Sequence, residues 1–146
     1  MAFFTSEYEC KLDAKGRLVL PAKIKANLPE ASNELVIMKG FDPNLVLYTK
    51  LEYKKIHNQF AALSDFDAQQ RKLKRNFFRS VAPVELDGAG RFLIPKTWIE
   101  HAKLEKQAVV IGTGNTIEVW NPAIYEDYLI TDSDEYSEMA KKFLDD

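Results

Sequence analysis

The sequence lacks several features that would by themselves assign a class of protein. Its only cysteine is Cys10, which excludes an internal disulfide and a cysteine-rich metal site. The longest apolar runs, at 35–38 and 108–111, fall far short of the roughly 20 residues that a membrane-spanning helix needs. The first ten residues lack the basic and apolar regions of a secretory signal. We therefore expect a cytoplasmic protein without a membrane partner.

Residues suited to catalysis are also scarce. His57 and His101 lie in helical stretches without Cys, Asp or Glu at metal-ligand spacing, and Cys10 fits a core or an interface better than the role of a nucleophile. The Gly-Thr-Gly-Asn run at 112–115 lacks the following helix and lysine of a phosphate loop, so it indicates a hairpin tip. We expect no enzymatic activity, metal, cofactor or small-molecule substrate.

What the sequence does have is the composition of a globular protein and an uneven distribution of charge. Apolar residues make up 46% and charged residues 29% of the 146 residues, which predicts a packed core. The net charge is −2, but residues 1–80 carry 14 basic and 9 acidic side chains, whereas residues 81–146 carry 6 and 13. This asymmetry fits a basic binding surface and fits an ordinary solvated surface equally well.

A ten-residue stretch occurs twice. LDAKGRLVLP at 12–21 returns as LDGAGRFLIP at 86–95, an offset of 74 residues. A two-residue length difference between Pro21 and Ile37 lowers the offset to 72, and apolar positions then continue to match from Ile37 and Val109 as far as Tyr53 and Tyr125. Each copy predicts a strand, a turn, a second strand, a short helix after the proline, a hairpin and the start of a helix. The units are 7–54 and 83–126, joined by a helical connector at 55–82.

The connector predicts two helices, at 51–63 and 67–79. The first has an apolar stripe that should pack on the strands, formed by Tyr53, Ile56, Phe60 and Leu63. The second follows the candidate caps Ser64 and Asp65 and is strongly basic. We interpret its basic face as solvated or as a subunit contact, not as a DNA contact; that face carries Arg71, Arg75 and Arg79. A last helix should begin near 121–122, and the acidic tail at 127–146 should be helical or partly disordered.

The repeated turn pairs an acid with a glycine and an arginine. Asp13 and Asp87 can accept hydrogen bonds from backbone N–H groups of their own turns, while Gly16 and Gly90 can supply the turn conformation. These four residues are therefore interpreted as shaping the turns.

The arginines have two possible roles. Arg17 and Arg91 can pair with the aspartate of their own turn, or can present donors to phosphates or guanine edges. Lys15 lies at the tip of the first turn, where the second has Ala89, so the first turn should be the more cationic one.

These paired Asp-x-x-Gly-Arg turns, with the VVIGTGNTIEVW segment after the second, resemble the MraZ family of transcriptional regulators, whose halves are each similar to the AbrB-type swapped-hairpin domain. The resemblance extends to about Tyr128. It implies an α+β fold, mainly β, in which two pseudo-repeated AbrB-like units form a small β-barrel with helices packed outside.

The resemblance also implies a function. A nucleoid-associated, sequence-specific regulator of this kind, expected to be a repressor, would bind short direct repeats upstream of the bacterial division and cell-wall gene cluster, including its own operon. It would do so as a homo-oligomeric ring, with Lys15, Arg17 and Arg91 contacting double-stranded DNA. The alternative is a ring-forming protein-interaction scaffold without specific DNA binding, in which the Asp and Arg side chains only brace the turns.

Overall fold

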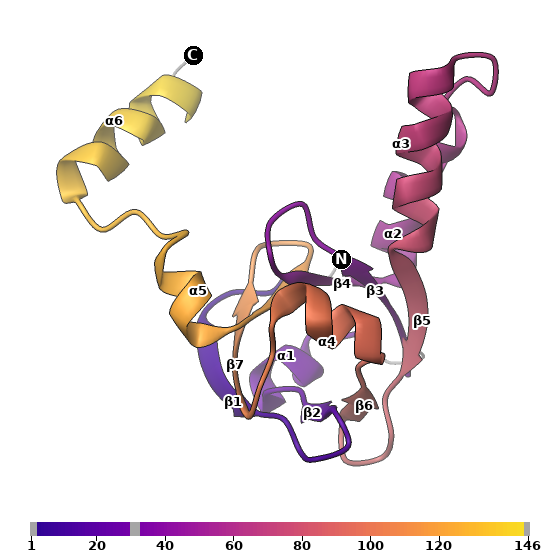
Figure 1. The fold of residues 1–146 in the computed structure, drawn as a ribbon. Coiled ribbons are helices and arrows are strands. Elements are labelled where there is room, and N and C mark those ends of the chain that lie inside the picture. Colours follow the sequence, from indigo (N-terminus) through magenta and orange to yellow (C-terminus); the bar gives the residue numbers. More distant parts are fainter. Residues whose placement is uncertain (1–2, 30–32, 145–146) are drawn as a thin grey trace.

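The computed structural model describes residues 3–29 and 33–144, and strands form most of its body (Figure 1). Within these residues there are eight strands and six helices. The strands are β1 (Glu7–Lys11), β2 (Arg17–Val19), β3 (Glu34–Lys39), β4 (Leu45–Thr49), β5 (Val81–Glu85), β6 (Arg91–Leu93), β7 (Gln107–Gly112) and β8 (Ile117–Trp120). The helices are α1 (Ala22–Ala26), α2 (Lys50–Ala61), α3 (Ala68–Arg79), α4 (Lys96–Ala102), α5 (Pro122–Glu126) and α6 (Ser133–Leu144).

The repeat in the sequence is a repeat in the structure. Each copy forms a strand, the Asp–Arg turn, a short strand, a short helix and a two-stranded hairpin, in that order. Both hairpins predicted from the sequence are present, as β3–β4 and β7–β8. Pro21 and Pro95 occupy the N-cap positions of α1 and α4, where a missing N–H costs the helix no hydrogen bond.

The two units exchange their first strands. β1 pairs antiparallel with β7 of the second unit, with Tyr8 opposite Val110, and β5 pairs antiparallel with β3 of the first unit, with Val84 opposite Leu35. The hairpins meet where β4 pairs with β8, so the six-stranded sheet has the order β1-β7-β8-β4-β3-β5. Each unit therefore completes the sheet of the other within one chain.

A separate two-stranded ribbon is formed by β2 and β6, one strand from each unit. The ribbon pairs Arg17 with Leu93, Leu18 with Phe92 and Val19 with Arg91. Closure of the six-stranded sheet and this ribbon into a single barrel stays a prediction, because the strand pairing joins them into two separate hydrogen-bonded sets.

The core lies between the sheet and the ribbon. Leu18 and Phe92, which are equivalent in the repeat and opposite each other in the ribbon, are almost completely buried. They belong to one apolar cluster with the inward-facing residues of β4 and β8, namely Leu45, Leu47, Ile117 and Val119. Cys10 is half-buried against this cluster, in agreement with the core position expected for it, and burial raises the pKa of its thiol.

The connector forms a helical hairpin that packs on the strands, as predicted, and also on itself. Tyr53 of α2 contacts Tyr48 of β4, while Phe60 stacks on Phe77 of α3 with ring centroids 4.0 Å apart. The cap of α3 is Asp67, whose side chain accepts a hydrogen bond from the Gln70 N–H. The predicted caps Ser64 and Asp65 are wrong, since these residues precede the cap.

A helix begins at 122, as expected for 121–122, and a second one, α6, occupies 133–144 of the tail. Asn121 caps α5, and α6 stands away from the strands on the side of the view opposite the α2–α3 hairpin (Figure 1). Among the helices in the described ranges, none has both the length and the apolar character that crossing a membrane requires.

Candidate nucleic-acid interface

The first turn is closed by its aspartate. One carboxylate oxygen of Asp13 accepts hydrogen bonds from the backbone N–H groups of Lys15 and Arg17, both at 2.9 Å. The backbone closes the same loop through Asp13 N–H to the Arg17 carbonyl and Gly16 N–H to the Asp13 carbonyl. Gly16 has φ of 83°, a left-handed conformation that favours glycine.

The second turn has the same construction. Asp87 accepts hydrogen bonds from the N–H groups of Ala89 and Arg91 at 2.9 Å, and Gly90 has φ of 82°. These hydrogen bonds hold the pKa of Asp87 below its ordinary value; the largest cause is the backbone N–H of Arg91, and burial opposes it. The Arg17 backbone N–H has the same leading effect on the pKa of Asp13. The turn-shaping role of both aspartates stays a prediction, and these hydrogen bonds are the contacts through which it would act.

Each arginine pairs with the aspartate of its own turn through Nε only. The Nε of Arg17 lies 2.7 Å from Asp13 Oδ2, and the Nε of Arg91 lies 2.9 Å from Asp87 Oδ2. A guanidinium has four further N–H groups on its terminal nitrogens, and these make no hydrogen bond within the described residues. Pairing therefore orients the arginine and leaves its terminal N–H groups available to a ligand. An arginine of this kind can pair with the aspartate of its turn and present donors to DNA at the same time.

Both arginines lie on one face of the β2–β6 ribbon. Residues opposite each other in an antiparallel pair point to the same side, and Leu18 and Phe92 point into the core. The outer face is therefore formed by Arg17, Val19, Arg91 and Leu93. The two arginines are diagonal neighbours in the ribbon, a relation that in antiparallel strands separates two residues by roughly 7 to 8 Å and their Cβ atoms by somewhat less.

The short helices cross over to cover the opposite turns. A Cβ built on Gly16 would lie 2.9 Å from the Cδ1 of Ile99 on α4, and one built on Gly90 would lie 3.0 Å from the Cδ of Lys25 on α1. Lys25 and Ile99 are equivalent positions of the repeat. Each unit thus supports the turn of the other.

Lys25 is a candidate interface residue that the sequence analysis missed. Its Nζ lies 3.5 Å from the carbonyl oxygen of Gly88, so a cation accompanies the second turn although that turn has Ala89 at its tip. Lys15 is exposed at the tip of the first turn, as expected. A signal for Lys25 existed, because a basic residue stands where the other repeat has the apolar Ile99.

Both histidines lie on helices, as the sequence indicates. His57 packs edge-on against Tyr53 and Phe78 in the helical hairpin, and His101 lies on α4 with its Nε2 3.2 Å from the Asp42 carbonyl oxygen. In the described ranges, no three His, Cys, Asp or Glu side chains are arranged to hold a metal ion.

The fold and the turns together define a class of protein: a tandem repeat of two α+β units that exchange their first strands and carry one Asp–Arg turn each. Comparison with known sequences identifies the family. A family model described as "MraZ protein, putative antitoxin-like" matches residues 3–76 and again 77–146. The chain belongs to the MraZ family, as the resemblance predicted.

Several relatives match the chain over almost its full length. A protein of Cytophaga hutchinsonii named "Transcriptional regulator MraZ" is 48% identical over 145 residues, which cover 99% of this chain and 96% of that protein. Proteins with the same name from Heliobacterium modesticaldum and Carboxydothermus hydrogenoformans are 37% and 34% identical over 142 residues, and each match covers 97% of both chains.

Proposed function

We propose that this chain is a sequence-specific, double-stranded DNA-binding transcriptional regulator that acts through the outer face of its β2–β6 ribbon. The observation that carries the proposal is the pair of arginines on this face. Each is held by an aspartate through Nε, and its terminal N–H groups make no hydrogen bond to the part of the chain that the structure describes. A fixed arginine loses little conformational entropy when it binds the O6 and N7 acceptors of guanine. The names of the relatives support regulation of transcription as the purpose of such binding.

The shape of the ribbon fits the major groove of B-DNA. That groove is about 12 Å wide and admits a two-stranded ribbon. Val19 and Leu93 lie opposite Arg91 and Arg17 on this face and are 48% and 56% exposed, so they offer apolar contacts such as a thymine methyl group requires. Lys15 and Lys25 flank the face and suit phosphate contacts.

The charge of the ribbon argues for several copies acting together. Four cations, Lys15, Arg17, Lys25 and Arg91, are opposed by the two turn aspartates, so one subunit neutralises few phosphates and would bind weakly at physiological salt. A homo-oligomeric ring that presents several ribbons to short direct repeats would gain affinity through a high effective concentration. We propose repression of the cell's division and cell-wall gene cluster, including the protein's own operon, as the role of this assembly. Such a regulator works in the cytoplasm at the nucleoid and needs no catalysis.

Fluorescence anisotropy tests the proposal. The purified protein is titrated into duplex DNA from the region upstream of its own gene and into a shuffled duplex of equal length, at about 0.15 M salt. We expect binding to the upstream duplex to be at least 10³-fold tighter, the lower end for specific DNA binding. Equal affinity for both duplexes would contradict the proposal and favour the scaffold alternative, in which the protein assembles but does not recognise a sequence.

A further inference from the structure

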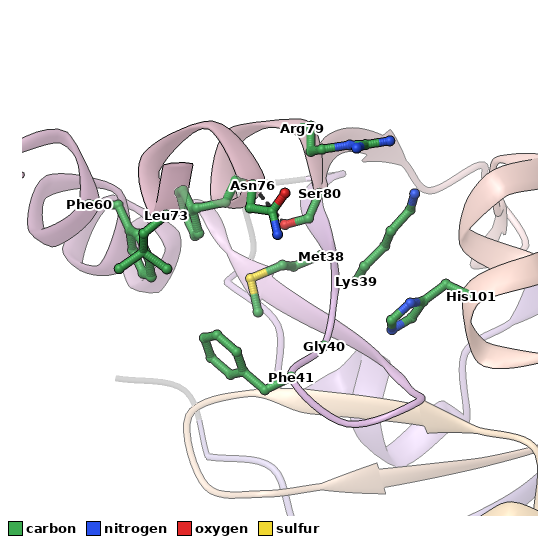
Figure 2. Close-up of a pocket in the computed structure, with 11 residues that line it drawn as sticks. Met38, Lys39, Gly40, Phe41, Phe60, Leu73, Asn76, Arg79, Ser80 and His101 are labelled. Atoms are coloured by element: carbon green, nitrogen blue, oxygen red, sulfur yellow. Dashed lines mark hydrogen bonds between the residues drawn. The ribbon is translucent and has the colours of Figure 1, made fainter. Parts of the chain in front are cut away.

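An open groove lies between the α2–α3 hairpin and the turn after β3. Its volume is about 360 Å³, and Figure 2 shows apolar side chains gathered in one part of it, with Lys39, Arg79 and His101 in another. Apolar residues of β3, the turn after it, α2 and α3 line it, namely Met38, Phe41, Phe60, Leu73 and Phe77. We call this the α3 groove.

Part of the apolar lining is open to solvent. Phe41 is 82% exposed and Leu73 is 48% exposed, whereas Met38 and Phe77 form a buried floor. A hollow with a buried apolar floor and exposed apolar rims leaves surface that a partner can remove from water.

A matching surface exists at the other end of the chain. Tyr136, Met139, Ala140 and Phe143 of α6 are spaced by three and four residues, so they form one apolar stripe along the helix. Tyr136 and Phe143 are 65% and 69% exposed, and the described part of the chain leaves the stripe uncovered. An amphipathic helix with this spacing of anchors is the usual occupant of an apolar groove.

The charges of the two surfaces are opposite. Helix α3 carries five basic side chains and no acid, and Lys72, Arg75 and Arg79 form no ion pair within the described residues. Residues 126–138, which lead into α6 and form its first half, carry six acids and no base. This complementarity favours the acidic segment at 126–138 as the partner of the basic helix α3. It also favours one direction of docking, with the acidic half of α6 close to the basic side chains.

We propose that α6 of one copy binds in the α3 groove of a second copy, joining subunits head to tail. The groove and α6 stand on opposite sides of the strand body (Figure 1), so each subunit offers one surface to each of two neighbours. Such a heterologous contact closes into a ring when the rotation between subunits allows it. The inference rests on the self-association in the proposed function and names the surfaces that produce it.

Two variants of the full chain isolate the contact. Met139→Asp places a charge in the stripe of α6, and Leu73→Asp places one in the groove; both side chains are partly exposed, so the fold should survive. Sedimentation velocity should show that each variant needs at least tenfold more protein to assemble than the unmodified chain. Ser137→Asp is the control, because it adds the same charge to α6 outside the stripe and should assemble normally.

Mixing the two variants gives the decisive result. The Leu73→Asp copy keeps an intact α6 and the Met139→Asp copy keeps an intact groove, so a mixture should form a one-to-one heterodimer and stop there. Assembly of both variants like the unmodified chain, or a mixture without heterodimers, would overturn the inference. Loss of assembly only in Met139→Asp would mean that α6 pairs with another α6, which also overturns it, as does a monomeric unmodified chain.

DNA binding separates this inference from the proposed function. Leu73→Asp should keep its affinity for a duplex with one repeat and lose at least tenfold on a duplex with several repeats. If no form of the protein prefers its upstream DNA while the mixing experiment succeeds, the regulatory function fails and the docking of α6 stands.

Discussion

Arg17 and Arg91 share a ribbon face, an aspartate partner and a free guanidinium fork, yet their surroundings differ. Arg17 follows the exposed Lys15 in its own turn, whereas the cation near Arg91 is Lys25, brought from α1 and directed at the Gly88 carbonyl. A cation from a neighbouring helix is less free to reach a phosphate than one at a turn tip. The two turns therefore differ in where their accompanying cation comes from and in how freely it can move.

Arg17→Ala should weaken binding to the upstream duplex more than Arg91→Ala does. Loss of a guanine contact costs about 1 to 3 kcal/mol, and the loss is repeated in every subunit that is engaged. Anisotropy titrations over several salt concentrations, with Lys25→Ala as a third variant, measure the order. Lys25→Ala should lower the salt slope without changing sequence preference. Equal losses of affinity for the two arginine variants would refute the predicted difference between the turns. Normal binding by Arg17→Ala would mean that the first turn has only a structural role.

Gly16→Ala should destabilise the fold. At φ of 83° a side chain adopts a left-handed conformation that costs about 1 to 2 kcal/mol, and its Cβ would lie 2.9 Å from the Cδ1 of Ile99. Gly88→Ala is the matched control, since its φ is not in the left-handed region and a Cβ there meets no atom within 4 Å. Urea unfolding of both variants gives the comparison. Equal stability of the two would show that the turn adapts to a side chain.

The turn aspartates should make the ribbon sensitive to acid. Their folded-state pKa values are lowered, so the stability they contribute is present above the unfolded value of about 3.9 and is lost as the pH falls through the folded value. NMR titration of the side-chain carboxyl carbons should place the pKa values of Asp13 and Asp87 below the ordinary aspartate value of about 3.9. A pKa at or above the ordinary value for either turn would mean that its hydrogen bonds do not form in solution.

At the scale of elements, local patterns predicted the hairpins and turns but not their partners. The apolar runs on either side of 41–43 and 112–114 predict β3–β4 and β7–β8, because a hairpin's partner strand is adjacent in sequence. The pairing of β1 with β7 joins segments about 100 residues apart, and no local pattern reports it. Lys25 was missed for this reason, since it reaches the second turn only after the units have exchanged elements.

The cap of α3 shows another limit. Ser64, Asp65 and Asp67 are all residues that can cap a helix, and composition alone does not choose between them. In the structure Asp65 forms an ion pair with Lys74, whose Nζ lies 3.1 Å from its carboxylate. The N-cap of α3 is Asp67, two residues after Asp65. Side-chain contacts within the α2–α3 hairpin thus set the boundary.

The basic face of α3 should serve assembly and not DNA contact. The ribbon lies at the lower edge of the view and the free end of the α2–α3 hairpin at the top (Figure 1). Arg71→Ala combined with Arg75→Ala should leave affinity for a single repeat unchanged and reduce oligomer mass at low protein concentration. Light scattering and single-repeat anisotropy provide the two readouts. A loss of DNA affinity as large as that of Arg17→Ala, at normal oligomer size, would assign this helix to the DNA surface.

At the scale of the whole molecule, neither unit should fold as a monomer. Residues 1–76 expressed alone would leave β3 without β5 and the hairpin β3–β4 without β8, while β1 would lack its partner β7. Circular dichroism and NMR should show an unfolded chain or a dimer for this piece and for residues 77–146, and mixing the two should restore the native spectrum. A folded monomer of either piece would show that the exchange of strands is not needed for stability.

The exchange of β1 and β5 within one chain also has a kinetic and quantitative consequence. Two separate copies of a swapped-hairpin unit must meet before either can form its sheet, so their folded fraction would fall on dilution. Here the connector keeps both halves in the same molecule, and sheet formation is a first-order event that proceeds at the same rate at one molecule per cell as in a concentrated solution. Both turns are therefore present and correctly spaced in every newly made chain, even when the protein has become too scarce to assemble further.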